Sequence, residues 1–154
     1  YPDARIVQTH RDPVTAVVSV ASLSSVLHRA FGRQRHPARF GREVTTRWTE
    51  GRERSLELRR NGRVPPARIV DVHLHEVAAD PMSVVHRIYA QFDLPLSAAT
   101  ETRMRTFLAG HPRNAQGRHE YAPEPFGLDR EDLARRFRAY SEHFGVRPEM
   151  PLQG

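Results

Sequence analysis

The sequence predicts an α/β fold with a small parallel sheet and mostly helices. Two short segments, Tyr1–Asp12 and Ala67–Leu74, contain Ile-Val pairs that are typical of strands. The Asp12-Pro13 and Asp80-Pro81 pairs predict helix starts, because aspartate is a good N-cap and proline fits the first helical position. A parallel strand that leads into a helix needs neighbours to cover it. Since the chain also opens with a tyrosine, we expect residues 1–154 to be the C-terminal part of a longer domain.

Hydrophobic residues at helical spacing predict the remaining elements. Helices are expected over Pro13–Arg29, Val44–Arg60, Pro81–Phe92 and Ala98–Ala109, and from Asp129 to Gly145. The expected buried faces are Val14, Val17, Val18 and Ala21 in the first helix; Val44, Trp48, Leu56 and Leu58 in the second; Met82, Val85, Ile88, Tyr89 and Phe92 in the third; and Leu133, Phe137, Tyr140 and Phe144 in the last.

Segments rich in glycine, proline and polar residues predict the loops. Phe31–Gly41 is basic and is expected to be a mobile loop. Gly110–Phe126 is long for a loop inside a domain, which indicates either a functional segment or disorder. The proline-rich tail, residues 147–154, is expected to fray.

The composition fits one domain and excludes several kinds of site. The chain has no cysteine, so it contains no disulfide, thiolate metal site or cysteine nucleophile. We see no signal peptide and no apolar run long enough to span a membrane, and we therefore expect a cytoplasmic protein. All 24 basic residues are arginine, which we attribute to coding bias, but the net charge of +6 still favours anionic ligands.

The segment around Arg11 predicts an anion site. A strand ends here and a helix begins, so the amides and the positive end of the helix dipole face the tip of the strand. Arg11 lies at that tip, and Ser19 follows two turns into the helix. A guanidinium and a hydroxyl so placed are able to bind one phosphate.

A strand, then Arg-Asp-Pro, then a helix with serine eight residues after the arginine resembles the 3′-phosphate-binding element of sulfotransferases. These enzymes use 3′-phosphoadenosine 5′-phosphosulfate (PAPS), and the likeness is to their bacterial branch. The resemblance implies that Arg11 and Ser19 hold the 3′-phosphate of PAPS. It also implies a partial P-loop-type three-layer fold, as the C-terminal fragment of a sulfotransferase domain.

Two later segments extend the resemblance. The block VHLHEVAADPMSVVHRIYAQFDLPLS resembles a strand, turn and helix of the family, although Leu74 stands where tyrosine is usual and His75 where an acid is usual. The loop before the last helix resembles the family's cofactor loop, with Gly117 as its central glycine. This implies that Arg113, Gly117 and Arg118 complete the 3′-phosphate site.

The resemblance implies transfer of a sulfuryl group from PAPS to a hydroxyl or amine of a small-molecule acceptor. The Gly-rich loop that holds the 5′-phosphosulfate in the family, and the usual catalytic base, match nothing in this sequence. We therefore expect this chain alone to be inactive and assign no catalytic residue. His10 is interpreted as structural, and His73 and His75 are too few to predict a metal site.

Two other functions remain open at this point. One is a non-catalytic basic module that binds a nucleotide or another polyanion, and the other is a helical remnant without a ligand. A nucleic-acid site would gather arginines and aromatic residues on one face. Here the arginines are scattered among glutamates, so no specific nucleic acid is expected. The acceptor and the oligomeric state are left open.

Overall fold

The structure is a computed structural model that describes residues 3–32, 36–111 and 122–149. The chain divides into two compact units. The first, here called the sheet unit, comprises residues 1–10 and 64–120, and the second, the helical unit, comprises residues 11–63 and 121–154.

The sheet unit contains the parallel strand pair that the sequence predicts. Strand β1 (Ile6–His10) pairs in parallel with β2 (Ile69–His73), so that Ile6 lies opposite Ile69 and His10 opposite His73. A short 3₁₀ helix, η1 (Pro66–Arg68), leads into β2. The small parallel sheet within a mostly helical chain confirms the predicted fold class.

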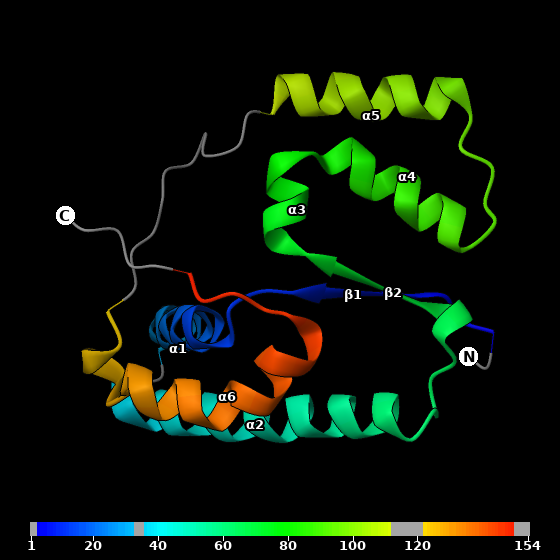
Figure 1. Cartoon of the computed structure of the whole chain (residues 1–154). Helices are drawn as coiled ribbons and strands as arrows, with labels where there is room; N and C mark the ends of the chain where they lie inside the picture. The colour runs from blue at the N-terminus through cyan, green and yellow to red at the C-terminus, as the bar shows by residue number, and fades with distance from the viewer. Residues whose placement is uncertain (1–2, 33–35, 112–121, 150–154) are drawn as a thin grey trace. The chain divides into compact units, whose positions relative to one another are not determined.

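Three helices follow β2 in the sheet unit: α3 (Leu74–Ala79), α4 (Pro81–Gln91) and α5 (Ala98–Gly110). Both α3 and α4 contact β2 (Figure 1). Asp80 caps α4 as predicted, since its Oδ1 accepts hydrogen bonds of 3.1 Å from the amides of Met82 and Ser83. The buried apolar residues of this unit are Ile69, Val70, Val72, Met82, Val84 and Phe92.

Two details of this unit differ from the prediction. The segment after β2 forms α3 rather than a turn, and it is held by the amide of His73, which donates to Glu76 Oε2 at 2.9 Å. In α4, Val84 is buried, whereas the predicted Val85 is only half-buried.

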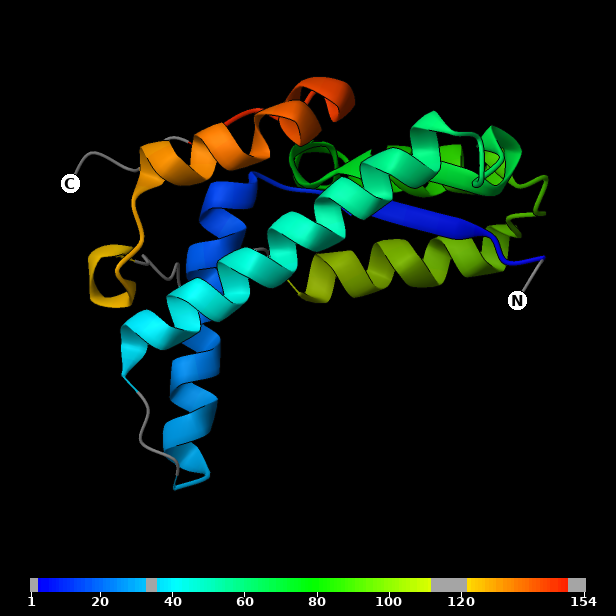
Figure 2. The ribbon, with the colours of Figure 1, turned by 90° about the horizontal axis from the view of Figure 1, so that it is seen from below.

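The helical unit is built from α1 (Pro13–Ala30), α2 (Pro37–Arg60) and α6 (Arg130–Phe144), with the 3₁₀ helix η2 (Glu124–Phe126) before α6. The three helices contact one another, and α2 passes across α1 (Figure 2). Their shared core confirms the predicted faces of α1 and α6. It consists of Val17, Val18, Ala21, Val44, Phe126, Leu133 and Phe137.

The expectation of a loop over Phe31–Gly41 is wrong for its second half, where α2 begins at Pro37. His36 caps this helix, because its Nδ1 accepts a 3.3 Å hydrogen bond from the amide of Ala38. Gly41 lies inside the helix, and a β-carbon there would overlap the carbonyl oxygen of Phe126. Pro37 therefore begins a helix, and Gly41 allows the close contact with Phe126, so neither residue marks a flexible loop.

The end of α6 is fixed by a second apolar cluster. Gly145 adopts a left-handed conformation (φ 63°) that ends the helix, and Val146 is then buried against Leu56, Tyr140 and Phe144. The chain is therefore anchored immediately after α6, and residues 147–149 continue from that anchor.

Candidate functional site

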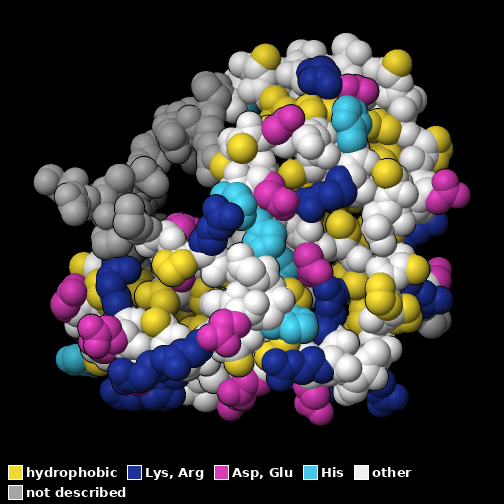
Figure 3. Space-filling view, in the orientation of Figure 1, with side chains coloured by type: hydrophobic (Ala, Val, Ile, Leu, Met, Phe, Trp, Pro, Cys, Tyr) yellow, Lys and Arg dark blue, Asp and Glu magenta, His cyan; other side chains and the backbone are white. Residues whose placement is uncertain are grey.

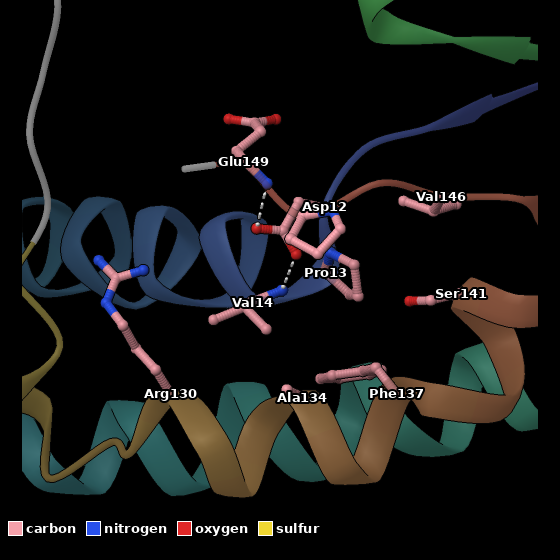
Figure 4. A pocket seen from close by; sticks show the side chains of 10 residues that line it. Asp12, Pro13, Val14, Arg130, Ala134, Phe137, Ser141, Val146 and Glu149 are labelled. Carbon is pink, nitrogen blue, oxygen red and sulfur yellow. Dashed lines mark hydrogen bonds between the residues drawn. The ribbon is translucent and has the colours of Figure 1, made fainter. Parts of the chain in front are cut away.

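The first turn of α1 is organised by the carboxylate of Asp12, which is buried. Its Oδ1 accepts a 3.1 Å hydrogen bond from the amide of Val14, and its Oδ2 accepts one of 2.8 Å from the hydroxyl of Thr15. The amide of Glu149 also donates to Oδ2, at 3.2 Å (Figure 4). Asp12 thus caps the helix as predicted and also holds the C-terminal segment of the chain against it.

Arg11, the residue predicted to bind a phosphate, presents its guanidinium to the side chain of Glu149. Its Nε donates to Oε1 at 2.8 Å and its Nη2 donates to Oε2 at 2.9 Å. The arrangement is bidentate, the geometry with which arginine also binds phosphate oxygens. The two side chains are 40% and 39% exposed, so this ion pair is open to solvent.

Ser19, the second predicted residue, is half-buried on α1. Helical spacing puts Asp12, Thr15 and Ser19 on one face of the helix, because residues three and seven positions apart are stacked along it. The amide of Glu149 bonds to Asp12 on the same face. Ser19 therefore lies along the side of α1 on which Glu149 and Asp12 meet, about 6 Å along the axis beyond Thr15.

A pocket of about 280 Å³ opens at the start of α1, between Asp12–Val14 and α6. Phe137 and Val146 supply apolar walls, Arg130 and Ser141 extend from α6, and Glu149 closes one side together with Asp12 (Figure 4). The pocket places apolar surface next to a pair of carboxylates and an arginine.

In the sheet unit, His10 is paired with a carboxylate of its own. Its Nε2 lies 2.9 Å from Asp71 Oδ1 on the neighbouring strand, and its side chain is 0% exposed. The ring of His73 lies beside it, 5.2 Å away between centroids. Because a buried side chain cannot reach a substrate, this arrangement agrees with the structural role expected for His10.

The carboxyl group of Glu76, which lies shortly after the end of β2, has a lowered pKa. Burial alone would raise its pKa, but the hydrogen bond from the His73 amide and the Arg87 guanidinium, 2.7 Å away, lower the pKa below its ordinary value overall. The charged carboxylate is therefore the form that the fold stabilises.

Not all of the predicted residues fall within the structure. Arg11 and Ser19 lie in the helical unit at the start of α1, as given above, whereas Arg113, Gly117 and Arg118 lie outside the described residues. His73 and His75, which are too few to predict a metal site, have ring centroids 5.3 Å apart. In the described part of the chain, no group of three or more acidic or histidine side chains is arranged to hold a metal.

Sequence reasoning missed Glu149 and Asp71, the carboxylate partners of Arg11 and His10. Each is far away in the sequence, by 138 and 61 residues, so no local pattern identifies it. The sequence gives only a weak indication of Glu149, which is the single acidic residue after Val146.

The surface of the described residues shows arginines beside acids. Figure 3 shows dark-blue and magenta side chains next to one another on the face drawn. The ion pairs of the described residues include Arg39–Glu43 at 2.8 Å and Arg136–Asp132 at 2.7 Å. None of the helices α1 to α6 in the described residues is both long enough and apolar enough to cross a lipid bilayer.

Comparisons with known proteins give consistent results. The model of the sulfotransferase family matches residues 1–98. The chain is similar to sulfotransferase STF9 from Mycobacterium avium, with a TM-score of 0.84 and 32% identity over 98% of this chain and 38% of that one. It is also similar to sulfotransferase STF1 from Mycobacterium tuberculosis H37Rv, with a TM-score of 0.73 and 32% identity over 90% of this chain and 34% of that one. A comparison with curated protein sequences finds no match.

Proposed function

The chain belongs to the sulfotransferase family, and we propose that its helical unit binds the 3′-phosphate of the sulfuryl donor PAPS. The donor would pass its sulfuryl group to a hydroxyl or amine of a small-molecule acceptor. The observation that carries this proposal is the Arg11 guanidinium, which already holds two anionic oxygens through Nε and Nη2 at the start of α1.

The residues around Arg11 fit a phosphate in two respects. The bidentate guanidinium matches the oxygens of a phosphate, and hydrogen bonds to a charged group contribute about 1.5–3 kcal/mol. The Ser19 hydroxyl lies on the same side of α1 and can add a further donor. The helix amides contribute less than the sequence predicts, because Asp12 already accepts from Val14.

In sulfuryl transfer, the acceptor oxygen or nitrogen attacks sulfur while the bond from sulfur to the bridging oxygen of the 5′-phosphate breaks. A base takes the acceptor proton, and adenosine 3′,5′-bisphosphate leaves. By analogy with phosphoryl transfer, most of the catalysis is positioning and charge stabilisation. Arg11 would contribute by anchoring the end of the donor remote from the reacting sulfur, as binding energy used for orientation.

The chain spans 38% and 34% of the two solved sulfotransferases. We propose that it supplies the 3′-phosphate side of the donor site, and that the residues that contact the sulfuryl group belong to the remaining length of such proteins. His10 is not proposed as the base, because its side chain is buried and bonded to Asp71. Arg113, Gly117 and Arg118 are proposed to close over the same phosphate.

The experiment compares the affinities for adenosine 3′,5′-bisphosphate and for 5′-AMP by isothermal titration calorimetry, in the wild type and in Arg11→Ala. We expect the bisphosphate to bind at least ~10-fold more tightly than 5′-AMP, and Arg11→Ala to remove most of that ratio, since the lost interaction amounts to about 1.5–3 kcal/mol. Arg138→Ala, which removes an exposed arginine from α6, is the matched control and should preserve the ratio.

Equal affinity for the two nucleotides, or an unchanged ratio in Arg11→Ala, would contradict the proposal. A general polyanion-binding module gives a different result in the same titrations. Such a module would bind the two nucleotides with similar affinity, and its affinity would fall steeply as the salt concentration rises.

A further inference from the structure

The side chain that Arg11 binds in this structure is itself an anion, and this bears on how the proposed site works. Glu149 offers two carboxylate oxygens to the same Nε and Nη2 donors that a phosphate would use. Arginine cannot give these two hydrogen bonds to both partners at once. A phosphate that binds Arg11 in a bidentate manner must therefore displace the Glu149 carboxylate.

The surroundings of Arg11 strengthen this conclusion. Asp12 is buried and carries a second carboxylate next in the chain, and Glu149 bonds to it through its amide. A doubly charged phosphate placed on Arg11 would lie close to the carboxylates of both Asp12 and Glu149. Because like charges at short distance oppose binding, Glu149 in its present position lowers phosphate affinity twice, by occupying the donors and by repulsion.

Glu149 is also held so that it returns to this position. Val146 is buried in the cluster with Tyr140 and Phe144, and the Glu149 amide donates to Asp12 Oδ2 at 3.2 Å. The backbone is thus fixed at both ends of the segment 146–149, whereas the Glu149 side chain is 39% exposed. We infer that carboxylate is exchanged for phosphate by a change of the Glu149 side-chain rotamer.

We propose that Glu149 is an intramolecular competitor for the phosphate site, which occupies Arg11 in the empty state and rotates away when the donor's 3′-phosphate binds. The inference rests on the proposed function, since it names the residue that regulates access to the same site. It assigns to the segment after α6 a role in setting the affinity for the donor.

The test is a set of calorimetric titrations with adenosine 3′,5′-bisphosphate at one ionic strength, in the wild type, Glu149→Gln, Arg11→Ala and the double variant. Glu149→Gln keeps the length of the side chain and removes its charge. We expect it to raise affinity by about threefold to tenfold, which is the size of an exposed ion pair together with a relieved like charge. In the Arg11→Ala background, the same substitution should change affinity by less than about twofold, because the contested donors are gone and only the screened repulsion from an exposed carboxylate is left.

Glu142→Gln is the matched control, because it removes one negative charge from an exposed position of α6 in the same unit. It should leave affinity within about twofold of the wild type, since exposed charges at a distance are screened by salt. Circular dichroism of each variant checks that the fold is retained. A rise in Glu142→Gln equal to that in Glu149→Gln would overturn the inference in favour of a general charge effect.

The two single variants distinguish failure of the competitor role from failure of the proposed function. If Arg11→Ala lowers affinity while Glu149→Gln lowers it as well or leaves it unchanged, the 3′-phosphate assignment stands and the competitor role is rejected. A lowered affinity would mean that Glu149 positions Arg11, and an unchanged affinity would mean that it does neither. If Arg11→Ala leaves the affinity unchanged, the phosphate assignment itself fails, and the competitor role fails with it.

Discussion

His10 and Arg11 are neighbours in the chain, and each binds a carboxylate from a distant residue at nearly the same distance. His10 Nε2 lies 2.9 Å from Asp71, and Arg11 Nε lies 2.8 Å from Glu149. The exposures differ: the His10 side chain is 0% exposed, whereas those of Arg11 and Glu149 are 40% and 39% exposed. A buried polar group has no water to replace a lost partner, but an exposed one does. Nearly equal distances therefore support a structural role in one case and an exchangeable ligand site in the other.

The largest expected effect on stability is at the pair that Asp71 forms with the buried His10. Asp71→Ala removes the carboxylate partner of His10 and leaves a buried ring nitrogen to find another. We expect the free energy of unfolding to fall by about 2 kcal/mol, within the range for an unsatisfied buried group. Urea denaturation measures this, and Asp3→Ala, at an exposed position of the same unit, is the control. A loss no larger than that of the control would contradict the structural role of His10.

An intermediate effect is expected at Glu76, which is part-exposed and bonded both to the His73 amide and to Arg87. Glu76→Ala should lower the free energy of unfolding at pH 7 by about 1 kcal/mol, the usual cost of removing a side chain that caps a helix.

The pH dependence of the Glu76 effect has a definite sign. Its pKa is lower in the folded chain than its ordinary value of 4.5, so the folded state favours the charged form. The stabilisation is fully present above that ordinary value and is lost as the pH falls through the lower, folded pKa. Wild type and Glu76→Ala should therefore converge in stability in acid. A difference that grows as the pH falls would show that the charge is not what stabilises the helix start.

The smallest effect on stability is expected at the exposed pair. Glu149→Gln should change the free energy of unfolding by no more than about 0.5–1 kcal/mol, because both partners can be solvated when the pair is broken. The change should shrink further at high salt, which screens exposed charges. A loss comparable to that of Asp71→Ala would mean that the Arg11–Glu149 pair is a structural element and would argue against its exchange for a phosphate.

The sequence was sufficient to predict elements whose evidence is local. The faces of α1 and α6 were found because Val17, Val18, Leu133 and Phe137 recur at helical spacing. The caps at Asp12 and Asp80 followed from the aspartate that precedes each of these two helices. The two strands were likewise predicted from short apolar segments, each with an Ile-Val pair.

Other features depend on contacts that no local pattern contains. The start of α2 was missed because Pro37 and Gly41 are ambiguous: both are common in loops, and only the carbonyl of Phe126 explains the glycine. At the candidate site, Arg11 and Ser19 could be named from the order strand, arginine, helix, serine. Glu149 could not, since its meeting with Arg11 depends on how α6 returns the chain to the start of α1.

The buried Val146 has a quantitative consequence for any ligand of Arg11. With the chain fixed at Val146, Glu149 is tethered within about 10 Å of that point, since a residue spans at most about 3.5 Å. Short tethers of this kind correspond to effective concentrations in the millimolar range. A free anion would thus compete with a carboxylate whose local concentration is constant and independent of the protein concentration. Inorganic phosphate or simple carboxylates at micromolar concentrations would not displace Glu149 from Arg11, whereas a nucleotide that gains further contacts elsewhere would.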